Sequence, residues 1–110
     1  METIRYIKLK NKGGFVAKIH VSYRPEGEKS WKTWSPSGYA DICAAAERTQ
    51  DLKELGIADG SHVRLKAFVA LGKDNLADEE YLFFSSSGAT AAYEISGTTL
   101  INKRQLVSCG

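Results

Sequence analysis

Hydrophobic and polar residues alternate along the segment from Phe15 to Arg24. A period of two over ten residues is typical of a β-strand with one buried face and one solvated face. Residues 62–71 repeat the same alternation. We expect each of these two strands to turn five apolar side chains inward: Phe15, Ala17, Ile19, Val21 and Tyr23 in the first, and Val63, Leu65, Ala67, Val69 and Leu71 in the second.

Shorter apolar segments fill most of the remaining chain, and residues that favour turns separate them. Seven or eight short strands at this spacing predict an all-β fold, an antiparallel β-sandwich in a single domain spanning residues 1–110. We expect the two long strands to lie at the centres of the two facing sheets. The Asn11-Lys12-Gly13-Gly14 turn predicts that segment 15–24 returns antiparallel to the first strand. The shorter predicted strands are 3–10, 30–35, 80–84, 89–95 and 100–107.

The segment from Tyr39 to Leu55 has two interpretations. Apolar residues recur there at helical spacing and Gly56 follows as a helix-ending residue, so the alternative fold is α+β with one helix near 41–55. The neighbouring segments are both strands, and tertiary context often overrides helix propensity. We therefore favour a strand near 47–52, followed by a helical turn at 51–55.

Composition adds few constraints. The chain has 110 residues, of which 43% are hydrophobic and 25% charged, as in an ordinary globular domain. No apolar run approaches the roughly 20 residues of a membrane span, and the first residues lack a signal-peptide pattern. We expect a cytoplasmic protein, or one secreted by a leaderless route. Cys43 and Cys109 are expected to be free thiols in a reducing compartment, although the sequence leaves a bridge between them open.

Charge is unevenly distributed within the net total of +2. Residues 1–36 carry eight Lys/Arg and three Asp/Glu, whereas residues 37–110 carry seven and ten. A basic first third favours anionic partners through a local positive potential. The alternative is a solvated strand face whose charges discourage pairing with other chains.

No catalytic, cofactor or metal motif is present, so the sequence predicts neither an enzyme nor a cofactor. His20 and His62 lie on solvated strand faces without an identifiable partner. The cluster of Asp74, Asn75, Asp78, Glu79 and Glu80 lacks the spacing of a calcium-binding EF-hand, which favours a solvated acidic turn.

The functional prediction rests on an aromatic and basic segment. Trp31 and Trp34 are three apart, so a regular strand points them to opposite faces and one of them cannot enter the core. Exposed aromatic rings suit stacking on sugars or anchoring at a lipid surface. We predict a non-enzymatic binding module for a glycan or an anionic membrane surface, with these contact residues: Tyr23, Arg24, Lys29, Trp31, Lys32, Trp34 and Tyr39.

The layout of a basic opening hairpin before an aromatic segment resembles that of small leaderless β-sandwich proteins, the aegerolysins and fungal fruit-body lectins. The resemblance implies a lectin-like or lytic-toxin-like function. Nucleic acid is disfavoured, because no RNP, KH or cold-shock motif accompanies the basic residues. A second hypothesis is a structural protein that forms a homodimer through its edge strands, which would be the strands at 4–10 and 100–107.

Overall fold

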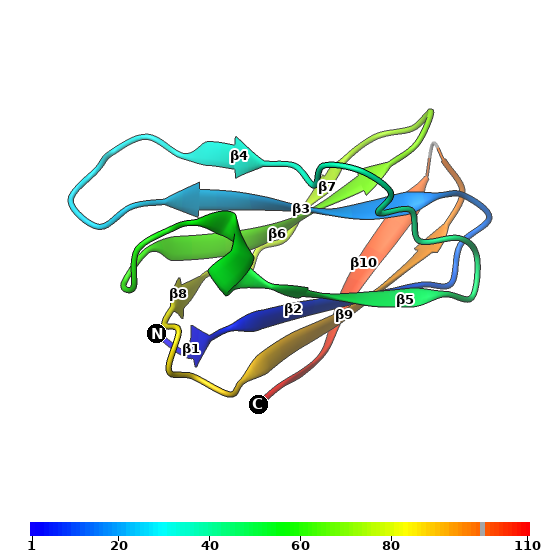
Figure 1. Cartoon of the computed structure of the whole chain (residues 1–110). Coiled ribbons are helices and arrows are strands. Elements are labelled where there is room, and N and C mark those ends of the chain that lie inside the picture. The colour runs from blue at the N-terminus through cyan, green and yellow to red at the C-terminus, as the bar shows by residue number, and fades with distance from the viewer. Residues whose placement is uncertain (100) are drawn as a thin grey trace.

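A computed structural model describes residues 1–99 and 101–110 of the chain and contains two β-sheets packed face to face (Figure 1). Sheet A has the strand order β1-β8-β6-β3-β4, with β7 beside β6, and sheet B has the order β10-β9-β2-β5. The strands are β1 (Thr3–Ile4), β2 (Tyr6–Asn11), β3 (Ala17–Arg24), β4 (Lys32–Trp34), β5 (Glu47–Asp51), β6 (His62–Val69), β7 (Asn75–Leu76), β8 (Tyr81–Phe83), β9 (Thr90–Gly97) and β10 (Asn102–Cys109).

The prediction of an all-β sandwich is confirmed, but its strand pairing is mixed. β1 pairs with β8 in parallel, and so does β2 with β9, while the other pairings are antiparallel. The described residues form ten strands because Arg5 separates β1 from β2 and because β7 is a two-residue strand. A sheet with parallel pairs requires connections that leave one sheet and return to it, and a hairpin pattern in the sequence does not reveal them.

Alternation determines which side chains form the core. In β6, every second residue from Val63 to Val69 is buried, and β2 and β9 follow the same pattern, as does β3 as far as Val21. Tyr93 and Phe83 are the largest side chains that are fully buried. Burial of this apolar surface between the two sheets is the main force that holds them together.

The segment near 41–55 is a strand followed by a helical turn, so the single-helix alternative is wrong. β5 pairs with β2, and Leu52–Leu55 forms a 3-10 helix. Asp51 caps this turn by accepting a hydrogen bond from the Lys53 backbone N–H, and Gly56 ends it at a φ of 74°. The backbone partners that β2 offers to β5 outweigh the helix propensity of the segment.

The expected hairpin between β2 and β3 is wrong, because the two strands lie in different sheets. The chain crosses between the sheets at Asn11, whose side chain is fully buried. Its Nδ2 group donates to the carbonyl oxygens of Phe15 and Ile42, and its Oδ1 atom accepts from the Gly13 N–H. This side chain satisfies the Phe15 carbonyl and the Gly13 N–H, and it adds a second hydrogen bond to the Ile42 carbonyl, which also accepts from the Ala17 N–H.

The expectation that the two long strands occupy separate sheets is also wrong. β3 and β6 pair with each other at the centre of sheet A, and β2 and β9 form the centre of sheet B. β6 ends at Val69, so Leu71 lies beyond the strand, fully outside the core at 99% exposure. Of the expected edge strands, β2 is central, whereas β1 and β10 do end their sheets. Self-association through these edges stays a prediction.

Cys43 and Cys109 are both free thiols in the structure. In the part of the chain that the structure describes, no helix has the length and apolar character needed to span a bilayer.

Replacing Asn11 by Ala is expected to destabilise the protein by about 2–5 kcal/mol, because it leaves the buried Phe15 carbonyl and Gly13 N–H without partners and removes one of the two hydrogen bonds that the Ile42 carbonyl accepts. Chemical denaturation gives the free energy of unfolding. Ser86→Ala in an exposed turn is the control and should change it by less than about 0.5 kcal/mol. A loss below about 1 kcal/mol for Asn11→Ala would contradict the role given to this side chain.

Candidate functional site

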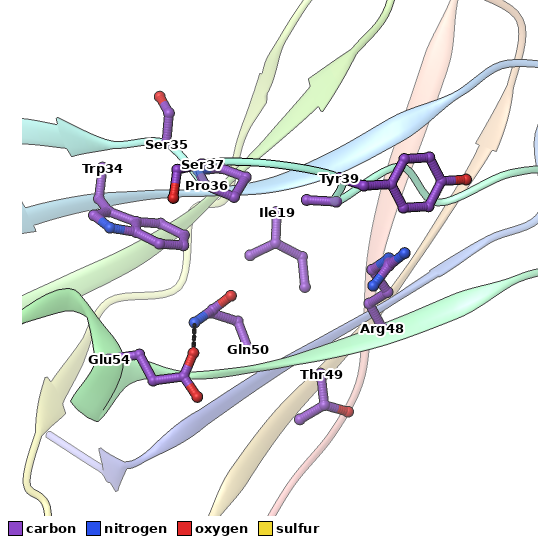
Figure 2. Close-up of a pocket in the computed structure, with 11 residues that line it drawn as sticks. Ile19, Trp34, Ser35, Pro36, Ser37, Tyr39, Arg48, Thr49, Gln50 and Glu54 are labelled. Atoms are coloured by element: carbon purple, nitrogen blue, oxygen red, sulfur yellow. Dashed lines mark hydrogen bonds between the residues drawn. The ribbon is translucent and has the colours of Figure 1, made fainter.

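A cleft of about 430 Å³ opens where the β4 edge of sheet A faces the β5 edge of sheet B. We call it the edge cleft. Figure 2 shows the rings of Trp34 and Tyr39 on one side of the cleft, the side chains of Arg48, Gln50 and Glu54 facing them, and Ile19 between. The remaining lining residues are Ser35, Pro36, Ser37, Ala40 and Thr49.

Packing holds the aromatic groups of the edge cleft in place. Trp34 is half-buried against the core, whereas Tyr39 is 75% exposed. The Arg48 guanidinium lies 5.3 Å from the centre of the Tyr39 ring, and Arg48 Nε donates to the Asp41 carbonyl at 2.9 Å. One exposed ring is therefore held beside a cation at the mouth of the cleft.

Polar groups occupy the sheet B side of the edge cleft. Gln50 Nε2 donates to Glu54 Oε2 at 3.3 Å and to the Asp51 carbonyl at 3.0 Å. These contacts orient an amide and a carboxylate next to the Trp34 ring (Figure 2). A flat aromatic surface beside such groups can stack on a sugar ring and hydrogen-bond its hydroxyls.

A second set of side chains covers the outer face of sheet A. Trp31 precedes β4, and its ring reaches across β3 to Arg64 of β6, whose guanidinium lies 4.0 Å from the ring centre. The Arg24 guanidinium lies 5.5 Å from the same ring. Ser22, on the strand between them, is only 6% exposed. We call Arg24, Trp31, Arg64 and Lys66 the arginine face.

His20 and Phe68 continue the outer face of sheet A toward the β6–β7 turn. Their rings stack with centroids 4.8 Å apart, and Lys18 Nζ lies 5.6 Å from the Phe68 ring centre. Burial lowers the pKa of His20, the charge of Asp74 raises it, and the charges of Lys18 and Lys66 lower it further. His20 is thus held toward its neutral form.

His62 has a carboxylate partner that the sequence did not identify. Its Nδ1 atom lies 2.6 Å from Glu80 Oε2. The edge cleft contains neither His62 nor His20. Among residues 1–99 and 101–110 there is no group of three or more His, Cys, Asp or Glu side chains that could hold a metal ion.

The seven predicted contact residues do not form one site. Trp34 and Tyr39 line the edge cleft, and Arg24 and Trp31 belong to the arginine face. Tyr23 packs against the core, opposite Lys32 across the β3–β4 pair. The remaining two predicted residues are exposed: Lys29 in the β3–β4 loop, and Lys32, whose Nζ lies 3.5 Å from Glu28 Oε1.

Sequence reasoning missed the partners that complete each surface. Arg48, Gln50 and Glu54 reach the edge cleft from β5 and the 3-10 turn, and Arg64 reaches the arginine face from β6. The polar positions of the second long strand were a signal for Arg64. The sequence did not show that Arg64 lies beside Trp31, because this depends on pairing between strands that are distant in sequence.

A third surface lies at one end of the sandwich. The β6–β7 and β9–β10 turns meet there, at the right of Figure 1, opposite the β3–β4 loop. Leu71 and Ile101 project from these turns with exposures of 99% and 73%. We call these two residues the apolar tip. Lys73 N–H donates to the Thr99 carbonyl at 3.3 Å, and Asn102 Nδ2 donates to the Lys73 carbonyl at 3.0 Å, so the two turns are bonded together.

We expect His20 to titrate below the ordinary histidine pKa of about 6.5. Removing a positive neighbour in Lys66→Gln should raise the pKa of His20, and Asp74→Asn should lower it. Because the folded-state pKa lies below the unfolded one, the stability associated with His20 is present above about pH 6.5 and is lost as pH falls. An NMR titration of the imidazole measures each value. A His20 pKa above that of unfolded histidine would contradict the burial of the ring.

No family model matches the chain, and no curated protein matches it in sequence. Among solved structures, it is similar to a disulfide-locked mutant of intermedilysin determined with human CD59, with a TM-score of 0.50 and 21% identity over 94% of this chain and 24% of that chain. It is also similar to the cytotoxin suilysin from Streptococcus suis, with a TM-score of 0.48 and 19% identity over 94% of this chain and 23% of that chain.

The membrane-binding domain of pneumolysin has a TM-score of 0.47 and 19% identity, and the match covers 94% of this chain and 96% of that domain. The chain spans less than a quarter of the length of the first solved structures that it matches. A likeness at such identities shows a shared fold alone. The intermedilysin match supports the two-sheet architecture.

Proposed function

We propose that the chain is a non-enzymatic binding module that attaches to a membrane surface through the apolar tip. A shared sandwich does not by itself transfer a function, so the proposal depends on the side chains at this end of the molecule. Membrane binding is the function named for the pneumolysin domain of similar fold. The proposal agrees with it but is carried by Leu71 and Ile101.

The conformation of Leu71 is the observation that carries the proposal. Its φ is 59°, a left-handed value that costs a leucine on the order of 1 kcal/mol. Its side chain is 99% exposed, so packing inside the protein does not compensate for this cost. Leu71 holds the third position of the turn that Gly72 N–H closes on the Val69 carbonyl at 3.1 Å, where a left-handed residue is usually glycine or asparagine, and strain of this kind is a recognised mark of a functional position.

The neighbouring turn fixes the position of Leu71. A Cβ atom at Gly72 would lie 2.2 Å from the Thr99 carbonyl oxygen, so only glycine allows the two turns to approach this closely. Ile101 is held in its own turn by hydrogen bonds with Thr98. The protein therefore presents two aliphatic side chains at one end on rigid supports, which reduces the entropy lost on binding.

The size of the apolar tip suits reversible attachment. Burying one leucine or isoleucine side chain in an apolar phase contributes about 1.5–3 kcal/mol. Lys73, exposed in the same turn, adds an attraction to anionic headgroups of about 1 kcal/mol. These contributions predict weak binding that strengthens with anionic lipid and weakens with salt.

Replacing both residues of the apolar tip, in Leu71→Asn with Ile101→Asn, should weaken binding to vesicles by at least about a hundredfold. Asparagine tolerates the left-handed conformation, so the turn should survive. Co-sedimentation with vesicles of phosphatidylcholine and phosphatidylserine measures the effect. The control is Val107→Asn on β10, where a half-exposed apolar side chain is removed away from the tip. Equal binding by the double variant and the unmodified protein would exclude attachment through the tip.

A glycan is a second candidate ligand, favoured by the geometry of the edge cleft. The Trp34 ring lies near the amide of Gln50 and the carboxylate of Glu54, and the Tyr39 ring lies beside Arg48 at the other end of the cleft (Figure 2). Such a lining suits one or two neutral sugar units. Salt separates the two candidates, because stacking on a neutral sugar is insensitive to screening while attraction to anionic lipid is not.

Tyr39→Ala should reduce glycan affinity by about tenfold without affecting stability, because the ring is mostly exposed. The measurement is an NMR titration with methyl glycosides of glucose, galactose, mannose and N-acetylglucosamine. Tyr6→Ala, on the outer face of sheet B, is the matched aromatic control. If no glycoside shifts the backbone signals of Gln50 and Glu54, the edge cleft is not a sugar site.

A further inference from the structure

We propose that the arginine face is a separate binding site for a sulfated polysaccharide chain. This inference is independent of membrane attachment, because the apolar tip lies in turns at the end of the strands, whereas Trp31 and Arg64 stack over the face of sheet A. Its centre is the pair of guanidinium groups that share the Trp31 ring.

Arg64 is the central residue of the site. Its guanidinium stacks 4.0 Å from the centre of the Trp31 ring, and its Nε atom is buried without a hydrogen-bond partner. Within the described part of the chain, no carboxylate lies within 4.0 Å of Arg64. Because Nε is covered, the terminal amino groups of this guanidinium are the donors that an external anion can reach, and they can bind it in bidentate fashion.

Arg24 provides the second guanidinium of the site. It lies 5.5 Å from the Trp31 ring centre, and its Nη1 atom donates to the Glu28 carbonyl at 2.8 Å. Because Ser22 is opposite Arg64 in the β3–β6 register, Arg24 and Arg64 are diagonal neighbours on one face. The ring fixes both guanidinium groups before a ligand arrives, so less side-chain entropy is lost on binding.

A further cation extends the site along β6. Lys66 lies two residues beyond Arg64 on the same face, about 6.5–7 Å along the strand. His20, which is held toward its neutral form, is opposite Lys66 across the β3–β6 pair and adds no full charge. Lys66, like Arg64, forms no ion pair among the described residues, whereas Glu80 lies beside His62, which is two residues before Arg64 and opposite Arg24. The result is three cations, Arg24, Arg64 and Lys66, along one face of sheet A.

The aromatic rings on this face argue for recognition of charge rather than of bases. The Trp31 ring is stacked against Arg64, and the Phe68 ring is stacked against His20. Binding of single-stranded nucleic acid relies on open aromatic faces for its bases. With these faces occupied, the cations themselves are the ligand-binding groups. A row of cations at strand spacing matches an extended polymer that carries strong anions at intervals, and sulfate esters on a sugar chain provide them.

The test uses size-defined heparin oligosaccharides and isothermal titration at low salt. Arg64→Gln and Arg24→Gln should each reduce affinity by about tenfold, which corresponds to the loss of a charge-assisted hydrogen bond. Arg64→Lys retains the charge but loses the planar donor fork, so its affinity should lie between those of the unmodified protein and Arg64→Gln. Lys103→Gln removes the same charge from an exposed position on β10 and should change affinity by less than about twofold.

Several outcomes would overturn the proposal. Equal losses of affinity in Lys103→Gln and Arg64→Gln would mean that binding depends only on the net charge of the protein. Absence of binding to heparin oligosaccharides would exclude a sulfated polysaccharide as the ligand. Tighter binding to a single-stranded oligonucleotide, or equal binding to desulfated heparin, would identify a different ligand class. Thermal unfolding confirms that each variant is folded. The double variant of the apolar tip should bind heparin oligosaccharides normally, which separates failure of this site from failure of membrane attachment.

Discussion

The buried side chain of Asn11 holds the point at which the chain passes from one sheet to the other. Its three hydrogen bonds satisfy the backbone at a position where neither sheet can do so. The crossing places β2 at the centre of sheet B and β3 at the centre of sheet A, with their apolar faces toward each other. Much of the sandwich follows from this placement, because β5 and β9 then pair with β2, and β4 and β6 pair with β3.

The same placement leaves the edge cleft open. β4 has three residues and β5 has five, and they belong to different sheets, so the two sheets do not close on each other at this side. The segment that connects β4 to β5 passes this opening, and its Ile42 forms an isolated β-bridge with Ala17 of β3. Trp34 fills part of the opening from β4, and Gln50 lines it from β5. The cleft is thus a consequence of how the sheets end.

Alternation in the sequence predicted most strands and most of the core, because side-chain direction in a strand follows from local geometry. It also predicted correctly that Trp31 and Trp34 point to opposite faces. Sheet membership and pairing were not predictable in the same way. The Asn11–Gly14 turn has the composition of a hairpin, and only the buried contacts of Asn11 with Phe15 and Ile42 distinguish a crossing from a hairpin.

The sequence identified only some residues of each candidate surface, because strand pairing brings the others in from distant segments. Trp31 and Arg24 are close in sequence, but Arg64 joins them through the β3–β6 register. Leu71 matched the alternation of its segment and was assigned to the core, yet β6 ends two residues earlier. A period-two pattern identifies a strand but does not show where its hydrogen bonding stops. The exposure of Leu71 therefore depends on the turns that follow it.

Strand direction separates the two proposed contacts in space. Arg64 and the end of β6 at Val69 are five residues apart, a span of about 17 Å, and Leu71 follows in the turn beyond. That length exceeds the screening distance of about 8 Å at physiological ionic strength, so the charge of a ligand on the arginine face barely reaches the apolar tip. With the tip at a membrane, the strands of sheet A point toward the surface and the arginine face remains exposed on the side. A sulfated chain bound there would be held beside the membrane rather than displaced by it.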